Sequence, residues 1–263
     1  MTDITVRKIR FAFDEPIDLD LSDEQLATVL PMLGLSMTMP YLEPYLIRTM
    51  KTALPQISDP QLVEDVRGFS KQEGHHYRNH AKFNEQIRGH FDDALADELR
   101  GIEAALEADY QRYTREKSLR FNVAYAEGFE AMTCAAALAT AEHGGFDGLP
   151  GGEIWAWHMA EEIEHRTVAF GVFEHLVHSY PYRVLAGGWA QVHYVSYIVR
   201  FARCMARGIG RKLTRPSSPM HRAALRRYLG TLSPRYDPAK IEIPRGVEEL
   251  LARYSALAEQ ASA

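Results

Sequence analysis

Apolar residues between positions 22 and 178 recur at intervals of three and four, the spacing of one buried face of an α-helix. Helix breakers are few and lie mainly near 31–44, 55–60 and 144–152. No segment of this region alternates strictly between apolar and polar residues, as a half-buried strand would. The pattern therefore predicts an all-α protein. The expected helices cover approximately residues 22–53, 58–88, 93–117, 118–142, 153–179, 184–212, 219–229 and 246–261.

Prolines set two further expectations. We expect the first helix to be broken or kinked near Pro31 and Pro40, because proline removes a backbone hydrogen bond and clashes with the preceding turn. The helix that begins near residue 153 should stop before Pro181.

The chain divides into three parts. Residues 1–21 form an extended segment, 22–180 a helical bundle, and 181–263 a basic helical extension packed on the bundle. The apolar stretch 184–199 contains Gln191 and His193, and it is shorter than the roughly 20 residues that span a membrane. We therefore expect an interfacial or buried amphipathic helix there.

Two Glu-x-x-His triplets carry the main chemical signal. They are Glu73 to His76 and Glu162 to His165, each inside a long expected helix. Residues three apart on a helix share one face, so each pair can reach one metal ion. Both pairs occupy positions in the apolar stripe that forms the buried face of their helix, where an unpaired carboxylate is costly. The four side chains therefore need a common buried partner.

Two single glutamates complete a repeated pattern. Glu43 precedes the first triplet by 30 residues, and Glu127 precedes the second by 35. A dinuclear carboxylate site in a four-helix bundle takes one glutamate from each of two helices and a Glu-x-x-His pair from each of the other two. The predicted metal ligands are Glu43, Glu73, His76, Glu127, Glu162 and His165. Four carboxylates and two imidazoles favour two iron ions, with manganese or a mixed manganese–iron pair as alternatives.

Three stretches resemble a known family, the bacterial proteins labelled predicted metal-dependent hydrolases, within the ferritin-like di-metal carboxylate superfamily. They are Phe69 to Asn84, Trp155 to Phe173 and Ser233 to Pro244. The resemblance implies a ferritin-like four-helix bundle with additional helices and a C-terminal extension. Glu130 lies one turn after Glu127 and is the alternative ligand on that helix, but the resemblance favours Glu127.

Other polar residues on the same helices are candidates for supporting roles. Glu161 precedes a predicted ligand, and the resemblance implies that it orients a ligand histidine. His80 and His158 lie one turn from the ligands, as hydrogen-bonded core histidines, extra ligands or a proton relay.

We expect a dinuclear enzyme that activates O₂ to oxidise an apolar small molecule. The first alternative is a metal-dependent hydrolase that activates a bridging water, with Glu161 or His158 as general base. The second is a non-enzymatic metal-binding or storage bundle. The chain lacks the Gly-x-Ser-x-Gly motif of many serine hydrolases.

Charge is distributed unevenly. The net charge is −5, yet residues 183–235 contain eleven basic residues and no acidic one. This segment has two interpretations, a mixed surface with homodimer contacts or a surface for a membrane or an acidic carrier; it has no nucleic-acid-binding motif. Two cysteines and an N-terminus without an apolar signal core favour a cytoplasmic protein, with contact at the inner membrane face as an option.

Overall fold

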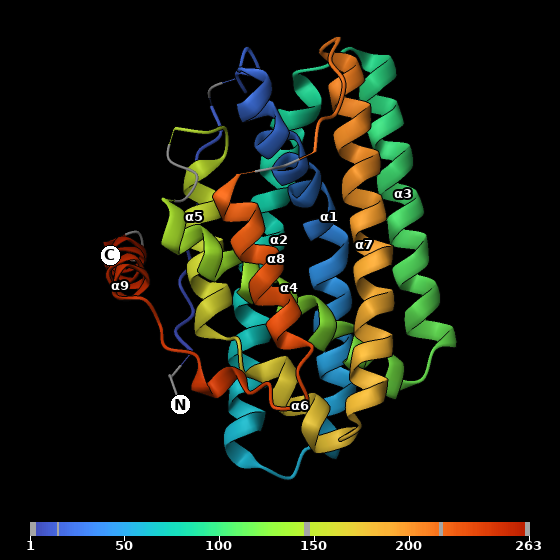
Figure 1. The fold of residues 1–263 in the computed structure, drawn as a ribbon, viewed down its shortest axis with the longest axis vertical. Helices are drawn as coiled ribbons and strands as arrows, with labels where there is room; N and C mark the ends of the chain where they lie inside the picture. The colour runs from blue at the N-terminus through green and yellow to red at the C-terminus, as the bar shows by residue number, and fades with distance from the viewer. Residues whose placement is uncertain (1–3, 15, 145–147, 216–217, 261–263) are drawn as a thin grey trace.

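A computed structural model describes residues 4–14, 16–144, 148–215 and 218–260 of the 263-residue chain. The described residues form α-helices and no β-strand, which confirms the predicted all-α class (Figure 1). The helices are α1 (Asp23–Ala53), α2 (Pro60–Gly89), α3 (Asp93–Glu116), α4 (Leu119–His143), α5 (Gly152–Glu164), α6 (Val168–Leu176), α7 (Tyr180–Gly208), α8 (Pro219–Thr231) and α9 (Arg245–Gln260). Short 3-10 helices cover Leu54–Gln56 and Pro238–Lys240.

Polar caps fix the starts of the long helices. Ser22 and Gln25 form a reciprocal capping box before α1. The Asp59 carboxylate accepts a hydrogen bond from the Gln61 amide at 2.9 Å and caps α2. Pro60 follows at the first helical position, as the sequence predicts.

Helix α1 has no break near Pro31 and Pro40, where the sequence predicts a break or a kink. It runs as one helix through Pro31, Pro40 and Pro44. An interior proline costs roughly 3 kcal/mol. Packing outweighs this cost, because α1 lies between α2, α3, α4 and α7 and buries side chains along most of its length.

Two other boundaries differ from the prediction. The single helix expected over 153–179 is divided into α5 and α6 by a turn at His165 to Thr167. Helix α7 begins at Tyr180 rather than near 184, with Pro181 in its first turn, where the missing amide donor has no helical partner to lose.

The N-terminal segment has no helix over 4–14 and 16–22, as expected, and residues 1–3 and 15 of it lie outside the described residues. The last expected helix reaches residue 261, and α9 ends at Gln260, the last described residue.

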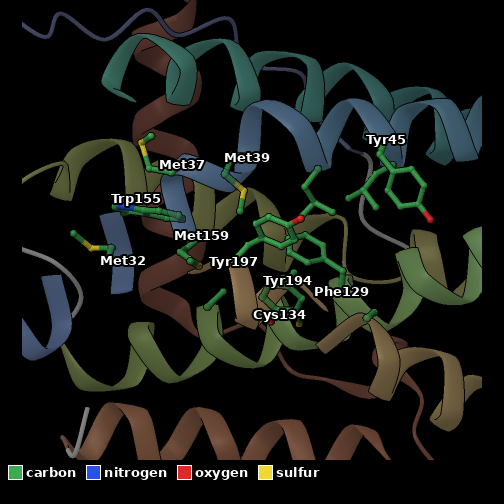
Figure 2. Packing of buried hydrophobic residues seen from close by; sticks show 14 of the residues in the cluster. Met32, Met37, Met39, Tyr45, Phe129, Cys134, Trp155, Met159, Tyr194 and Tyr197 are labelled. Carbon is green, nitrogen blue, oxygen red and sulfur yellow. The ribbon is translucent and has the colours of Figure 1, made fainter. Parts of the chain in front are cut away.

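The packing of the helices positions the site. Helix α1 lies beside α2, and α4 contacts α1, α5 and α7. Helix α3 runs alongside α7 at one edge of the molecule, α8 covers α4, and α9 packs on α5 at the opposite edge (Figure 1). Figure 2 shows part of the core, where Met32, Met159 and Trp155 lie close together. Within the described residues, no helix is long and apolar enough to cross a membrane.

Candidate metal centre

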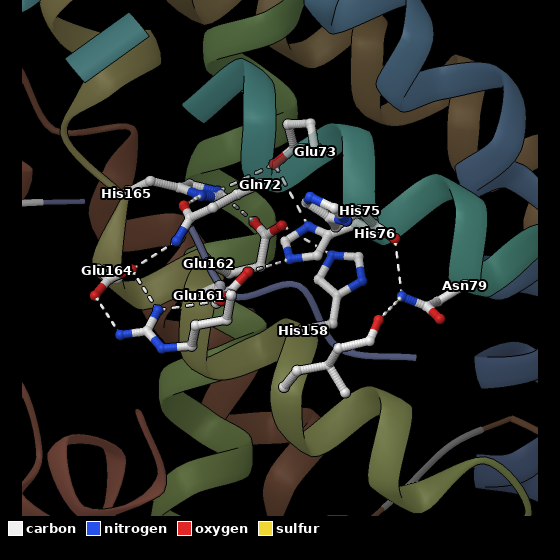
Figure 3. A network of polar contacts seen from close by, with 12 residues as sticks. Gln72, Glu73, His75, His76, Asn79, His158, Glu161, Glu162, Glu164 and His165 are labelled. Atoms are coloured by element: carbon white, nitrogen blue, oxygen red, sulfur yellow. Dashed lines mark hydrogen bonds and ion pairs between the residues drawn. The ribbon is translucent and has the colours of Figure 1, made fainter. Parts of the chain in front are cut away.

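Four helices bring buried carboxylates and imidazoles to one place. Glu43 comes from α1, Glu73 and His76 from α2, Glu130 from α4, and His158 and Glu162 from α5, with His165 directly after α5. All seven side chains are at most 3% exposed. We call them the central cluster; Figure 3 shows its α2 and α5 members.

Distances divide the central cluster into two overlapping halves. One half contains Glu73, Glu130 and His165, where His165 Nε2 lies 3.4 Å from Glu73 Oε1 and 3.3 Å from Glu130 Oε2. The other half contains Glu43, His76 and His158, whose donor atoms all lie within 4.8 Å of one another.

Glu73 and Glu162 lie between the halves. Glu73 Oε1 is 3.6 Å from His76 Nδ1 and 3.4 Å from His165 Nε2. Glu162 Oε1 is 2.9 Å from His158 Nε2, and its Oε2 is 3.6 Å from His165 Nε2. Two cations placed in the two halves would share these carboxylates.

The central cluster leaves many polar atoms without partners. Among the described residues, these atoms are fully buried and have no hydrogen-bond partner: Glu43 Oε1 and Oε2, Glu73 Oε1 and Oε2, His76 Nδ1, Glu130 Oε1, Glu162 Oε2 and His165 Nε2. A buried polar group without a partner is costly. Carboxylate oxygens and imidazole nitrogens both bind metal ions, so one kind of partner would satisfy all of these atoms. The donor set therefore fits bound metal ions.

Hydrogen bonds fix the orientation of both predicted histidine ligands. His76 Nε2 lies 2.9 Å from Glu161 Oε2, and His165 Nδ1 lies 3.0 Å from Gln72 Oε1. Each acceptor holds a proton on the outer ring nitrogen, so the inner nitrogen is the one that would give its lone pair to a metal ion in the central cluster once deprotonated. Glu161 thus has the predicted position behind a histidine.

A buried arginine connects these two supports. Arg7 donates to Glu161 Oε1 at 3.1 Å and to both oxygens of Glu164 at 2.9 and 3.0 Å. Gln72 Nε2 donates to the same Glu164 at 2.6 Å. The Arg7 guanidinium therefore balances two buried carboxylates and links the supports of His76 and His165.

Arg7 reaches this position from the N-terminal segment, and α9 covers it. Its Nε donates to the Leu251 carbonyl at 3.2 Å and to Ser255 Oγ at 2.9 Å. Sequence reasoning did not identify Arg7, Gln72 or Glu164, because their partners are 67 or more residues away.

A second hydrogen-bonded chain fixes His158. Asn84 Nδ2 donates to the Ser36 carbonyl at 3.0 Å, so Asn84 Oδ1 is the acceptor of the Ser36 hydroxyl at 2.7 Å. Ser36 Oγ must then accept from His80 Nδ1 at 2.8 Å. His80 Nε2 in turn accepts from His158 Nδ1 at 2.8 Å. Neutral His158 therefore presents its Nε2 lone pair to Glu162 Oε1 at 2.9 Å, and two facing lone pairs require a proton or a metal ion between them.

The pKa values of both histidines in this chain support the neutral forms. Burial and neighbouring imidazoles lower the pKa of His80 well below its usual value, and they also lower that of His158. His158 thus has the geometry of an additional nitrogen ligand, and His80 orients it.

Protons occupy the central cluster when no metal is bound. Burial and the Glu162 carboxylate raise the pKa of Glu130 to about 8, while burial and Glu73 raise that of Glu43 well above its usual value. Burial alone would lower the pKa of His76, but the hydrogen bond to Glu161 and the nearby Glu73 carboxylate raise it to about 9.

Glu162 and His165 shift each other's pKa. Burial opposes both charges, yet Glu162 raises the pKa of His165, and the charge of His165 holds that of Glu162 well below its usual value. The metal-free centre is thus a set of buried acids and imidazolium groups that metal binding must deprotonate.

Glu127 does not join the central cluster, contrary to the prediction. Its Oε1 accepts from Arg183 Nη1 of α7 at 3.0 Å, and no group of metal-binding geometry in the described residues includes it. Glu130, the alternative on the same helix, is the α4 carboxylate that faces the central cluster.

The turn after α5 places His165. The His165 backbone leaves the helical region, with φ −94° and ψ 10°. The buried Arg166 side chain donates to the carbonyls of Ile163, Pro238 and Ile241 at 2.8 to 3.2 Å. These bonds join the turn to the segment Ser233 to Pro244, so two of the stretches quoted from the sequence meet behind the central cluster.

A family model described as predicted metal-dependent hydrolase matches residues 5–242. The chain belongs to this family. The matched range includes Arg7 and every residue of the central cluster, whereas α9 follows it. No curated protein and no solved structure matches the chain.

Membership of this family, together with the buried clusters of histidine and glutamate, supports a metal-dependent enzyme. Its description corresponds to the hydrolase alternative rather than to the O₂-activating enzyme expected first from the sequence. The ferritin-like relationship stays a prediction.

Proposed function

We propose that the protein is a metal-dependent hydrolase with two divalent cations in the central cluster. The observation that carries this proposal is the group of buried donor atoms without hydrogen-bond partners, which all point into one space between four helices. The ligands would be Glu43, Glu73, His76, His158, Glu130, Glu162 and His165.

Two bound cations would lower the pKa of a shared water and polarise the oxygen of a scissile ester, amide or phosphate. Family membership supports this reaction class over oxidation. The chain contributes a buried site in which Glu161 and Gln72 hold two imidazoles and His80 holds a third. Rigid orientation of ligand side chains is what a metal centre requires of its protein.

Glu161 is a positioning residue rather than a general base in this proposal. His76 and Arg7 each occupy one of its carboxylate oxygens. His158 is likewise committed, because its Nε2 faces Glu162 and its Nδ1 donates to His80. Neither residue therefore has an oxygen or nitrogen left to act as the general base expected from the sequence.

O₂-dependent oxidation is a second candidate. Four carboxylates and three imidazoles without a thiolate form a donor set suited to iron and manganese as well as to zinc. The two readings differ in their need for O₂ and for a redox-active metal, which makes them separable by experiment.

The test begins with the metal-free protein, loaded under anaerobic conditions with Fe(II), Mn(II) or Zn(II). We expect about two ions per chain, and turnover of ester, amide or phosphoester substrates without O₂ and with Zn(II). Failure of the loaded protein to bind stoichiometric metal would overturn the proposed metal centre. Turnover that requires both iron and O₂ would replace the hydrolase with the oxidative enzyme.

A further inference from the structure

A large cavity lies beside the central cluster. Its volume is about 600 Å³, within the range of small-molecule pockets, and it lies between α1, α4, α5, α7 and α8. Most of its wall is apolar. Four methionines line it: Met32, Met132, Met159 and Met220. Methionine side chains adapt to flexible apolar ligands because they are unbranched and polarisable.

The inner end of this cavity reaches the residues that support the central cluster. Trp155 lines the cavity, is 1% exposed, and its ring centroid lies 5.4 Å from that of His158 in a stacked arrangement. Thr133 lines the floor one helical turn after Glu130, and Met159 directly follows His158. A molecule in this cavity would therefore end next to the ligand shell. Met32, Trp155 and Met159, which all line the cavity, lie close together in Figure 2.

The outer end is positively charged. Arg203 on α7 and Arg215 after it line the cavity and are exposed to solvent. No aspartate or glutamate is among the described residues that line it. The adjacent hollow contains Arg215 with Asp23 and Glu24, and Asp23 pairs with Arg211 at 3.5 Å. His221 also lines the cavity, but burial lowers its pKa, so it adds little charge at neutral pH.

We propose that this cavity binds an amphipathic anion, a flexible apolar chain with a carboxylate or phosphate group at one end. The chain would lie along the methionines and the anionic group would contact Arg203 and Arg215. The combination of an apolar interior, a cationic mouth and no acidic lining residue selects this class over neutral or cationic amphiphiles. The inference goes beyond the proposed function, because no residue of the central cluster lines this cavity.

The binding step can be tested without metal, so its failure is distinguishable from failure of the metal centre. Calorimetric titration of the metal-free protein would use dodecanoate, dodecyl phosphate and dodecyltrimethylammonium, each below its micelle-forming concentration. We expect one molecule of either anion to bind per chain and the cation to bind at least tenfold more weakly. The two anions separate a carboxylate from a phosphate preference. Equal binding of the cation would overturn the proposal.

Matched variants locate the bound anion. Arg203→Ala should weaken dodecanoate binding about tenfold, because it removes a charge-assisted hydrogen bond, and should flatten its salt dependence. Arg200→Ala is the control, because Arg200 lies on the same helix and does not line the cavity. Equal effects of the two variants would overturn the assignment of the mouth.

Filling the cavity tests its interior. Ala136→Phe on α4 should abolish binding of both anions while leaving metal stoichiometry at the wild-type value. If that variant does not fold, Ala224→Phe on α8 blocks the opposite wall. Full-strength binding to either folded variant would overturn the proposal.

Discussion

The Glu127 carboxylate lies 3.0 Å from the Arg183 guanidinium, in an ion pair that joins α4 to α7. Burial raises the pKa of Glu127 to about 7 even though Arg183 opposes this shift. Glu130, three residues later, faces His165 instead. One helical turn thus separates a carboxylate that holds two helices together from one that faces the central cluster.

This separation predicts opposite outcomes for two isosteric substitutions. Glu130→Gln should remove at least one of the two metal ions, because an amide cannot supply the anionic ligand. Glu127→Gln should keep both ions and lower the thermal stability, because it weakens the pair with Arg183. Metal analysis and thermal unfolding of the two purified variants would check this. Metal loss in Glu127→Gln with full content in Glu130→Gln would restore the original ligand prediction.

His158 is predicted to bind metal, and His80 to orient it. His158→Ala should lose one of the two ions or weaken binding by more than His80→Ala does. For His80→Ala we expect a weakening of about 10–100-fold, the usual effect of removing a support behind a metal ligand. Competitive titration with Mn(II) measures both. Unchanged affinity in His158→Ala would assign that residue to packing.

The metal-free protein should lose stability as pH rises. His76 has a pKa of about 9 in the folded state, above its unfolded value, so its contribution is full below about pH 6.5 and is lost as pH rises through 9. The raised pKa values of Glu130, at about 8, and of His165 act in the same direction. Thermal unfolding between pH 6 and 9 checks this slope, and a stability that rises over this range contradicts it.

Metal binding should release protons over the same interval. Groups that are protonated in the metal-free centre at pH 7 must be deprotonated to bind cations. The apparent affinity should therefore increase from pH 6 to 9. Calorimetry in two buffers with different ionisation enthalpies counts the protons; a pH-independent affinity without proton release would show that the bound metal lies elsewhere.

Arg7→Leu tests the link between the N-terminal segment and the centre. The substitution leaves Glu161 and Glu164 buried beside each other without their cation. Removing one member of a buried charged network costs about 3–5 kcal/mol. We expect that loss of stability together with weaker metal binding, because Glu161, which holds His76, loses the guanidinium that fixes its other oxygen. Arg10→Leu is the control, since Arg10 is exposed on the same segment. Equal denaturation curves for the two variants would contradict the proposed role of Arg7.

The parts of the site that depend on local spacing could be predicted from the sequence. Glu73 and His76 share a helix face three residues apart, so a periodic pattern is enough to place them together. Glu127 and Glu130 are both buried on α4, and the choice between them depends on Arg183, which lies 56 residues away from Glu127. That choice is made by tertiary packing and leaves no local signal.

The helix boundaries follow the same rule. Asp59 and Pro60 mark the start of α2 in the sequence itself. The turn at His165 contains neither glycine nor proline, so the sequence does not mark it. It is stabilised by Arg166, which donates to the distant carbonyls of Pro238 and Ile241. Arg7 is hidden for the same reason, since its partners on α5 lie more than 150 residues later.

The contact of Arg7 with Leu251 and Ser255 has a consequence for biosynthesis. A ribosome completes the four helices of the central cluster well before it reaches α9. Arg7 therefore makes its contacts with α9 only after the rest of the centre has been synthesised, and these contacts complete the brace, the hydrogen bonds of Arg7 that support His76 and His165 through Glu161 and Glu164. The nascent protein can gather its ligands during translation, but the brace behind His76 and His165 is complete only after α9 has left the exit tunnel.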